Sequence, residues 1–65
     1  MQIILNGQPR NISKIATVQG LLDELQLTGR LAVEINAQIV PRSLFQSHKI
    51  NAGDVIEIVR AIGGG

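Results

Sequence analysis

Hydrophobic residues near the N-terminal end form a short strand-like run that is followed by a turn signal. Ile3-Ile4-Leu5 is β-prone, and Asn6-Gly7 readily supplies the two positive φ values of a tight hairpin turn. The return strand, over residues 8–13, contains Pro9, which suits an edge strand because proline has no backbone donor. The pattern predicts a β-hairpin over residues 2–14.

The next segment has the periodicity of an amphipathic helix. Apolar side chains recur at the i, i+3, i+4, i+7 spacing of one buried helical face, at Val18, Leu21, Leu22 and Leu25. Thr17 precedes them and suits the N-cap, because its hydroxyl can accept from a free backbone N–H. We predict a helix that begins after Thr17 and ends at Thr28-Gly29.

The remaining segments are strand-like, with one short helical turn between them. Residues 31–35 predict a third strand with Glu34 facing solvent, and residues 38–40 predict a fourth. Ser43 is placed to cap a short helical turn. The final run, residues 55–62, has the strongest strand character in the chain.

This order of elements favours a two-layer α+β domain. One helix can cover one face of a mixed sheet. The crossover through that helix lets the first and last strands pair in parallel at the sheet centre. This is the arrangement of the ubiquitin-like β-grasp fold. We expect residues 1–62 to form the domain and residues 63–65 a flexible C-terminal tail.

Composition narrows the class of protein. The 65 residues allow one small domain, and a hydrophobic content of 45% is enough for a compact core. The absence of cysteine removes disulfides and thiolate metal sites, and it fits a reducing cytoplasm. We find neither an apolar run near the ~20 residues of a membrane span nor a signal peptide. We therefore expect a cytoplasmic protein.

Charge and chemistry-bearing residues argue against several functions. The net charge is +1 with scattered basic residues, and Phe45 is the only aromatic residue, so we do not expect nucleic-acid binding. His48 is the only histidine, and we expect no metal site. No acid–base pair or nucleophile indicates an active site. Arg42 and Arg60 fit solvated charges and contacts to an acidic partner equally well.

The most distinctive feature is the terminal Gly63-Gly64-Gly65. Three extended residues reach about 10 Å, and glycine permits close approach of the backbone to a ligand. Such a tail could place the α-carboxylate of Gly65 inside a partner's active site while the domain stays outside. The alternative is that these glycines are a frayed chain end, or residues added to the protein for its expression.

Taken together, the segments resemble the ThiS family, the sulfur carriers of thiamine thiazole synthesis. The likeness covers essentially the whole chain through the order and spacing of Ile3-Ile4-Leu5-Asn6-Gly7, Thr17-Val18…Leu21-Leu22, Ala32-Val33-Glu34-Ile35-Asn36, Ile39-Val40-Pro41-Arg42, Gly53-Asp54-Val55-Ile56-Glu57-Ile58 and the glycine end. The related MoaD carriers of molybdopterin synthesis are generally longer and often have prolines before the terminal glycines. This chain has Arg60-Ala61-Ile62 there.

The resemblance implies a covalent chemistry at Gly65. In the family, a ThiF-like adenylating enzyme uses ATP to adenylate the C-terminal glycine. Sulfur that originates from cysteine, through a desulfurase system, then displaces AMP and leaves a thiocarboxylate. A ThiG-like thiazole synthase receives that sulfur. The resemblance therefore implies a protein cosubstrate that is not an enzyme and binds no cofactor itself.

The tail also implies a docking surface on the domain. Ordering three backbone residues costs about 3–6 kcal/mol, and glycine brings no side-chain contacts to offset it. With Ile56 and Ile58 facing inward, alternation places Val59 and Ala61 on the open face of the sheet, and we expect Ile4 to face the same way. We predict that Ile4, Val59 and Ala61 form an apolar patch for the activating enzyme and the synthase. Ordinary scattered surface residues are the alternative.

Two other functions are compatible with these residues. The chain could be a sulfur carrier for molybdopterin, cysteine or siderophore synthesis. It could also be a ubiquitin-like module that binds through its sheet without covalent chemistry.

Overall fold

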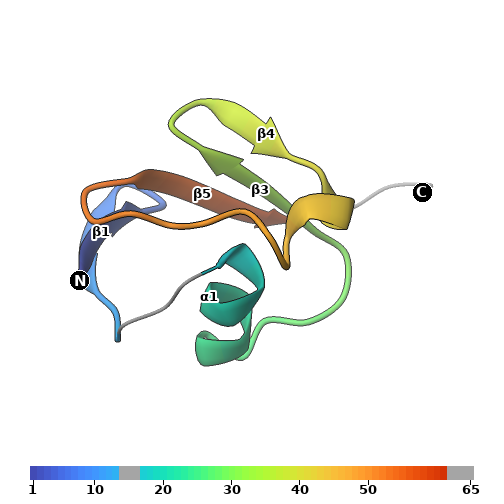
Figure 1. Cartoon of the computed structure of the whole chain (residues 1–65), viewed down its shortest axis with the longest axis horizontal. Helices are drawn as coiled ribbons and strands as arrows, with labels where there is room; N and C mark the ends of the chain where they lie inside the picture. Colours follow the sequence, from blue (N-terminus) through green and yellow to red (C-terminus); the bar gives the residue numbers. More distant parts are fainter. Residues whose placement is uncertain (14–16, 62–65) are drawn as a thin grey trace.

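A five-stranded mixed sheet with one α-helix against one face makes up the part of the chain that the computed structural model describes, residues 1–13 and 17–61 (Figure 1). The strand order is β2-β1-β5-β3-β4. In chain order the elements are β1 (Gln2–Leu5), β2 (Gln8–Asn11), α1 (Val18–Glu24), β3 (Leu31–Ile35), β4 (Gln38–Val40), the 3₁₀ helix η1 (Arg42–Leu44) and β5 (Val55–Arg60). This is the predicted two-layer α+β, β-grasp arrangement.

The first and last strands lie side by side at the centre of the sheet. β1 pairs with β5 in parallel, with Ile4 opposite Val55. On its other edge β5 pairs antiparallel with β3, as far as Leu31 opposite Arg60. The predicted crossover is thus confirmed. β5 is shorter than the predicted strand over residues 55–62, because it ends at Arg60. Residue 62 lies outside the described residues.

Both hairpins turn through residues in the left-handed conformation. Asn6 (φ 50°) and Gly7 (φ 81°) confirm the turn predicted between β1 and β2. The turn between β3 and β4 passes through Asn36 (φ 52°) and Ala37 (φ 71°). A Cβ is unfavourable there. The Asn36 side chain holds the turn, because its Oδ1 accepts from the backbone N–H of Val55 at 3.0 Å.

Helix α1 begins as predicted but ends earlier. Thr17 is the N-cap, and its hydroxyl accepts from the Gly20 N–H at 3.2 Å. The predicted end at Thr28-Gly29 is wrong, because the helix ends at Glu24.

The cause of the early end is Gln26, which adopts a left-handed φ of 58°. The Gln26 N–H bonds the carbonyl of Asp23 at 3.1 Å, and the Leu27 N–H bonds that of Leu22 at 2.9 Å. This is the hydrogen-bond pattern of a Schellman motif. The motif closes the helix without the glycine that usually marks such an end.

The predicted cap of the short helical turn is also wrong. Ser43 lies inside η1, and the N-cap is Pro41, which makes no side-chain capping bond. Proline fixes the entry backbone at φ −62°, and its carbonyl accepts from the Leu44 N–H at 2.9 Å. A side-chain cap is therefore not needed to start this turn.

The hydrophobic core lies between α1 and the inner face of the sheet. The strands contribute Ile3, Val33, Ile35, Val40, Ile56 and Ile58 to this core. The helix contributes Val18, Leu21 and Leu22, and the loops contribute Ile12, Phe45 and Ile50. The inward orientation predicted for alternate residues of β3 and β5 is confirmed. Leu25, at the C-cap of the helix, is only half-buried.

Candidate functional site

The strand that leads to the glycine tail is held firmly up to its last described residue. Ala61 donates its N–H to the carbonyl of Arg30 at 2.9 Å. The Arg60 guanidinium donates to the carbonyl of Thr28 at 3.0 Å, in the loop that follows α1. This bond gives Arg60 a structural contact that the sequence did not predict. Gly65, predicted to carry the covalent modification, lies outside the described residues, as do Gly63 and Gly64, predicted to thread the tail into a partner.

Alternation along β5 separates a buried face from an open one. Ile56 and Ile58 point into the core, whereas Glu57 and Val59 are exposed. The side chain of Val59 is 58% exposed. Ala61, beyond the strand, is exposed as well.

The predicted patch residues Ile4 and Val59 share the open face but lie in different rows of the sheet. Ile4 pairs with Pro9 on one side and with Val55 on the other. Val59 pairs with Ala32. Along β5 the two rows are four residue positions apart, from Val55 to Val59, which corresponds to about 13 Å. The open face therefore carries two apolar areas.

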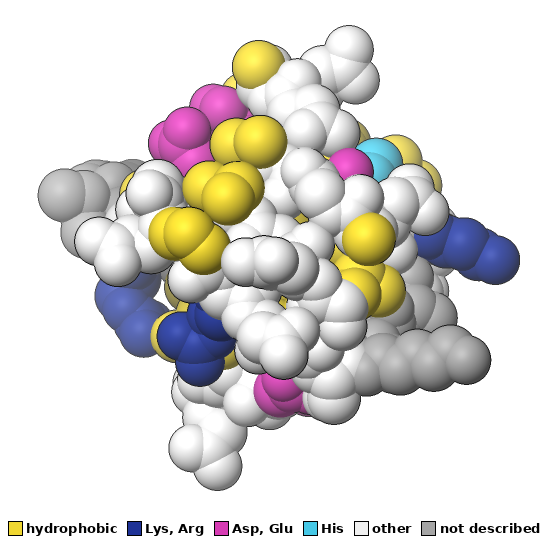
Figure 2. Space-filling view, turned by 90° about the vertical axis from the view of Figure 1, so that its left-hand side faces the viewer, with side chains coloured by type: hydrophobic (Ala, Val, Ile, Leu, Met, Phe, Trp, Pro, Cys, Tyr) yellow, Lys and Arg dark blue, Asp and Glu magenta, His cyan; other side chains and the backbone are white. Residues whose placement is uncertain are grey.

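Figure 2 views the molecule from the side on which β1 lies in Figure 1. Hydrophobic side chains gather in a row there, with acidic side chains beside one end of the row and basic ones beyond the other. In the first of the two apolar areas, Ile4 is half-buried and Val55, its partner on β5, is 45% exposed.

The second apolar area surrounds a shallow hollow that sequence reasoning missed. We call it the acidic hollow; its volume is about 150 Å³, and it is lined by Ala32, Val33, Glu34, Ile39, Glu57 and Val59. Ile39 is the most exposed large hydrophobic residue described, at 74%. Its position next to the buried Val40 in a short strand was the available signal, since neighbours in a strand face opposite sides.

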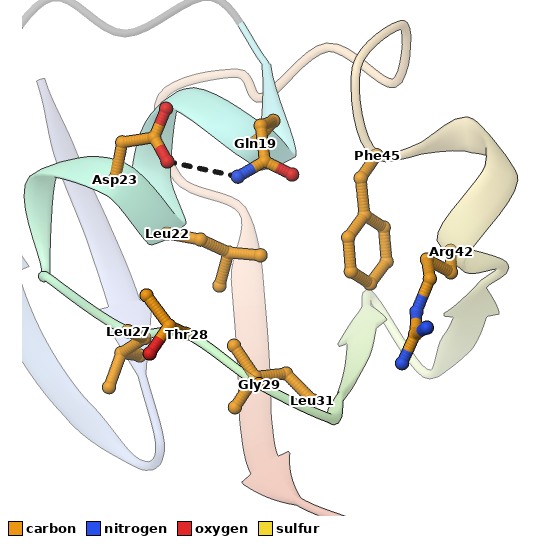
Figure 3. Close-up of a pocket in the computed structure, with 9 residues that line it drawn as sticks. All are labelled: Gln19, Leu22, Asp23, Leu27, Thr28, Gly29, Leu31, Arg42 and Phe45. Atoms are coloured by element: carbon orange, nitrogen blue, oxygen red, sulfur yellow. Dashed lines mark hydrogen bonds between the residues drawn. The ribbon is translucent and has the colours of Figure 1, made fainter.

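A different hollow, of about 330 Å³, lies on the helix side of the sheet (Figure 3). Leu22 and Phe45 contribute apolar surface, and Asp23 and Arg42 lie on opposite sides of it. Asp23 accepts a hydrogen bond from Gln19 at 2.9 Å. The structure thus places Arg42, whose role the sequence left open, on the helix side, away from the face that carries Val59.

The Gly53-Asp54 pair, which is part of the family resemblance, has a structural role. Gly53 has a positive φ of 87° in the turn before β5. The buried carboxylate of Asp54 accepts from the Asn51 N–H at 2.8 Å and from the Asn36 side chain at 3.1 Å. These bonds join the turn before β5 to the turn between β3 and β4.

No three His, Cys, Asp or Glu side chains of residues 1–13 and 17–61 gather as they would around a metal ion. His48 is half-buried in a loop, where its backbone carbonyl accepts from the Val18 N–H at 3.0 Å. None of the described helices is long and apolar enough to span a membrane.

Comparison with known proteins connects this geometry to one family. Thiazole synthase of Paramagnetospirillum magneticum is 47% identical over 66 aligned residues. The alignment covers 100% of this chain and 20% of that relative. The chain thus spans one fifth of that relative's length. Sulfur carrier protein ThiS of Escherichia coli K12 is 39% identical over the full length of both chains.

The fold has a close counterpart among solved structures. The crystal structure of thiamine biosynthesis protein ThiS from Geobacter metallireducens superposes with a TM-score of 0.88, covers all of both chains and is 28% identical. The family model described as ThiS family matches residues 3–65, which include the terminal glycines. With its β-grasp sheet, its anchored last strand and this match over nearly all its length, the chain belongs to the ThiS family.

Proposed function

We propose that this protein is the sulfur carrier for synthesis of the thiazole moiety of thiamine, with Gly65 as the residue that carries the sulfur. The observation that supports this most strongly is the family match over residues 3–65, because it extends through the three glycines. The E. coli relative of the same length is named a sulfur carrier protein. A carrier for molybdopterin, cysteine or siderophore synthesis has no comparable support.

The chemistry begins with activation of a carboxylate, which is a poor acyl donor. The Gly65 carboxylate oxygen attacks the α-phosphorus of ATP in the active site of a ThiF-like adenylating enzyme, and pyrophosphate leaves. The terminal sulfur of a persulfide from a cysteine desulfurase system then attacks the acyl carbon, and AMP leaves. A second thiol cleaves the S–S bond of the resulting acyl disulfide, which releases the thiocarboxylate and leaves a disulfide between the two thiol sulfurs. One oxygen of the carboxylate has been replaced by sulfur, and the thiocarboxylate is the nucleophile that a thiazole synthase receives.

The protein's own part in this chemistry is to present the reacting carbon. In this proposal the partner binds ATP, and the carrier binds no cofactor and contributes the carboxylate that is consumed, so it acts as a cosubstrate and not as an enzyme. Side chains in the tail would obstruct a narrow channel, whereas glycine permits close approach. Positioning the carboxylate against the α-phosphate is the main requirement of such a reaction. We propose that residues 63–65 act as a flexible tail on a domain of residues 1–62.

The domain must contribute binding energy of its own. Ordering the three glycines costs about 3–6 kcal/mol. Full burial of one large aliphatic side chain contributes about 1.5–3 kcal/mol, and Val59, at 58% exposed, and the half-buried Ile4 each contribute only the exposed part of this. Contacts on the open face therefore offset part of the ordering of the tail. We propose that Ile4, Val59 and Ala61 serve both the adenylating enzyme and the synthase.

A thiazole synthase is the partner for which the relatives provide support. Two relatives named thiazole synthase, from Paramagnetospirillum magneticum and Magnetococcus marinus, each contain a region similar to the whole of this chain. A carrier and a synthase within one polypeptide stay at high effective concentration. The absence of cysteine fits a cytoplasmic location for this exchange.

Intact-mass measurement tests the proposal. The protein is incubated with the adenylating enzyme of its own organism, ATP and a cysteine-based sulfur source. We expect one oxygen to be exchanged for sulfur, located at Gly65 by fragmentation. A ubiquitin-like binding module would keep its original mass, and that outcome would contradict the proposal.

A variant with one tryptophan added after Gly65 serves as the steric control. We expect it to fold normally and to remain unmodified, because the added side chain keeps the terminal carboxylate from reaching the α-phosphate of ATP. Addition of tryptophan before Met1 is the matched control, and we expect normal modification. Normal modification of the C-terminally extended protein would exclude the threading of Gly65.

A further inference from the structure

We propose that the acidic hollow on the open face receives an arginine side chain of the thiazole synthase. This inference rests on the proposed function and names the contact that would hold the two proteins together. The hollow combines two exposed aliphatic side chains, Ile39 and Val59, with two carboxylates, Glu34 and Glu57. It adjoins β5, the strand that continues into the glycine tail.

The two carboxylates are placed unfavourably for the isolated protein. Glu34 of β3 and Glu57 of β5 are direct cross-strand partners. Such partners have Cβ atoms about 4.5–5.5 Å apart, and like charges at this position repel. Within residues 1–13 and 17–61, the carboxylates that accept hydrogen bonds are those of Asp23, Glu24 and Asp54. The described part of the chain provides no donor for the Glu34–Glu57 pair.

An unfavourable local arrangement of this kind is typical of functional positions, where stability is given up for binding. A cation from a partner would remove the repulsion and replace it with two attractive contacts. Glu34 is half-buried and Glu57 is exposed, so a cation bound between them would be partly shielded from water. Partial shielding strengthens such contacts relative to those at a fully exposed surface.

Arginine has the shape and the chemistry for this hollow. Its aliphatic stem can cover apolar surface such as that of Ile39 and Val59 while its charged end reaches the carboxylates. The planar guanidinium carries several N–H donors and can serve two carboxylates at once, whereas lysine offers a single compact charge. The volume of about 150 Å³ is below the range of small-molecule pockets and fits a single side chain.

Affinity of the carrier for the thiazole synthase of the same organism is the quantity to measure, by titration calorimetry in low salt. We expect Glu57→Gln and Glu34→Gln each to weaken binding about tenfold, since each removes one member of a close charge contact. Glu57→Lys, which reverses the charge, is expected to weaken binding about a hundredfold. Added salt is expected to reduce the difference between wild type and variants.

The matched control is the same charge change on the helix side of the sheet. Asp23 lies on α1, away from the open face. We expect Asp23→Asn and Asp23→Lys to leave the affinity for the synthase unchanged. A second readout separates binding from folding: Glu57→Gln is expected to raise the urea midpoint of unfolding, because the cross-strand repulsion is gone. Weaker binding by a more stable protein cannot come from misfolding.

Three results would overturn the inference. They are unchanged affinity of Glu57→Lys, no measurable binding of the wild-type carrier to the synthase, and loss of wild-type binding when EDTA is added. The last result would indicate a metal ion between the proteins in place of arginine.

Intact-mass measurement on the same samples distinguishes this failure from failure of the proposed function. A carrier that gains sulfur at Gly65, but whose glutamate variants bind normally, refutes the arginine contact alone. A carrier that never gains sulfur refutes the proposed function.

Discussion

The side chain of Asn6 takes the place of strand β1 beside Ile58. Its Oδ1 accepts from the Ile58 N–H at 2.9 Å, and its Nδ2 donates to the Ile58 carbonyl at 3.2 Å. The backbone N–H of Asn6 bonds the carbonyl of Ile56 at 2.9 Å. Pairing along β5 therefore continues past Leu5, where β1 itself ends.

Loss of the Asn6 amide is expected to destabilise the protein. Asn6→Gly keeps the freedom to adopt a positive φ, so its effect reports the two side-chain hydrogen bonds. At about 0.5–1.5 kcal/mol for each bond, we expect the free energy of unfolding to fall by about 1–3 kcal/mol in urea denaturation. Asn6→Ala is expected to lose more, because a Cβ is unfavourable at that φ. A glycine variant as stable as wild type would show that the amide contributes nothing.

The left-handed residue at the end of α1 provides a site for stabilisation. Gln26→Gly relieves a conformation that is costly for residues with a Cβ, at the expense of a more flexible unfolded chain. We expect a net gain of about 0.5–1 kcal/mol in the free energy of unfolding, measured by thermal and urea denaturation. Gln26→Ala is the control, since it retains the Cβ, and it is expected to give no gain. A loss of stability in Gln26→Gly would refute the prediction.

Docking through the open face is tested with Val59→Glu. The side chain is 58% exposed, so the fold is expected to tolerate the change. We expect the catalytic efficiency of adenylation, kcat/KM, to fall about tenfold, which corresponds to 1.4 kcal/mol of lost binding. Leu44→Glu is the matched control: Leu44 is 46% exposed on η1, off the open face, and we expect no effect. Equal effects of the two variants would show that general surface hydrophobicity is responsible.

Glu24 is expected to make stability depend on pH. Its carboxylate accepts hydrogen bonds from the hydroxyl and, at 3.2 Å, from the backbone N–H of Ser13, and these bonds hold its pKa below the ordinary value of 4.5. A lowered native pKa means that the stabilisation is present above the unfolded-state pKa and is lost as pH falls through the native one.

Ser13→Ala removes the hydroxyl bond and is expected to be less stable than wild type at neutral pH, with the difference shrinking as pH falls through the lowered native pKa of Glu24. Urea denaturation across this range provides the measurement. Ser47→Ala is the control, because the Ser47 hydroxyl donates to the carbonyl of Leu44, which does not titrate. We expect its effect to be the same at every pH. A constant difference for Ser13→Ala would contradict the role of Glu24.

Elements with strong local signals were predictable from the sequence. Asn6-Gly7 supplies the turn of the first hairpin, Thr17 caps the helix, and the alternation of Ile56 and Ile58 orients the last strand. The end of α1 was not predictable, because a glutamine in the left-handed conformation gives no compositional signal. Local pattern and local structure agree where backbone preference is strong, and they differ at the end of α1, where a local hydrogen-bond motif holds a residue other than glycine at an unfavourable φ.

The acidic hollow could not be predicted for a different reason. Glu34 and Glu57 meet only because β3 and β5 pair in one register, and a shift of one residue would place one of them on the other face. A second register, that of β1 on β5, places Ile4 opposite Val55 and so separates it from Val59, although alternation alone had grouped the two into one patch. The sequence pattern predicts which face of the sheet a side chain lies on. Which side chains are neighbours on adjacent strands is known only once the register of the strands is known.

The central position of β5 has a mechanical consequence. An enzyme that draws the chain end into its active site pulls along the strand axis. Because β1 and β3 bond both edges of β5, such a force loads these hydrogen bonds in shear, so that they resist together. An edge strand could instead be peeled away one bond at a time. Under the proposed function, this placement lets the domain be held by its end without unravelling.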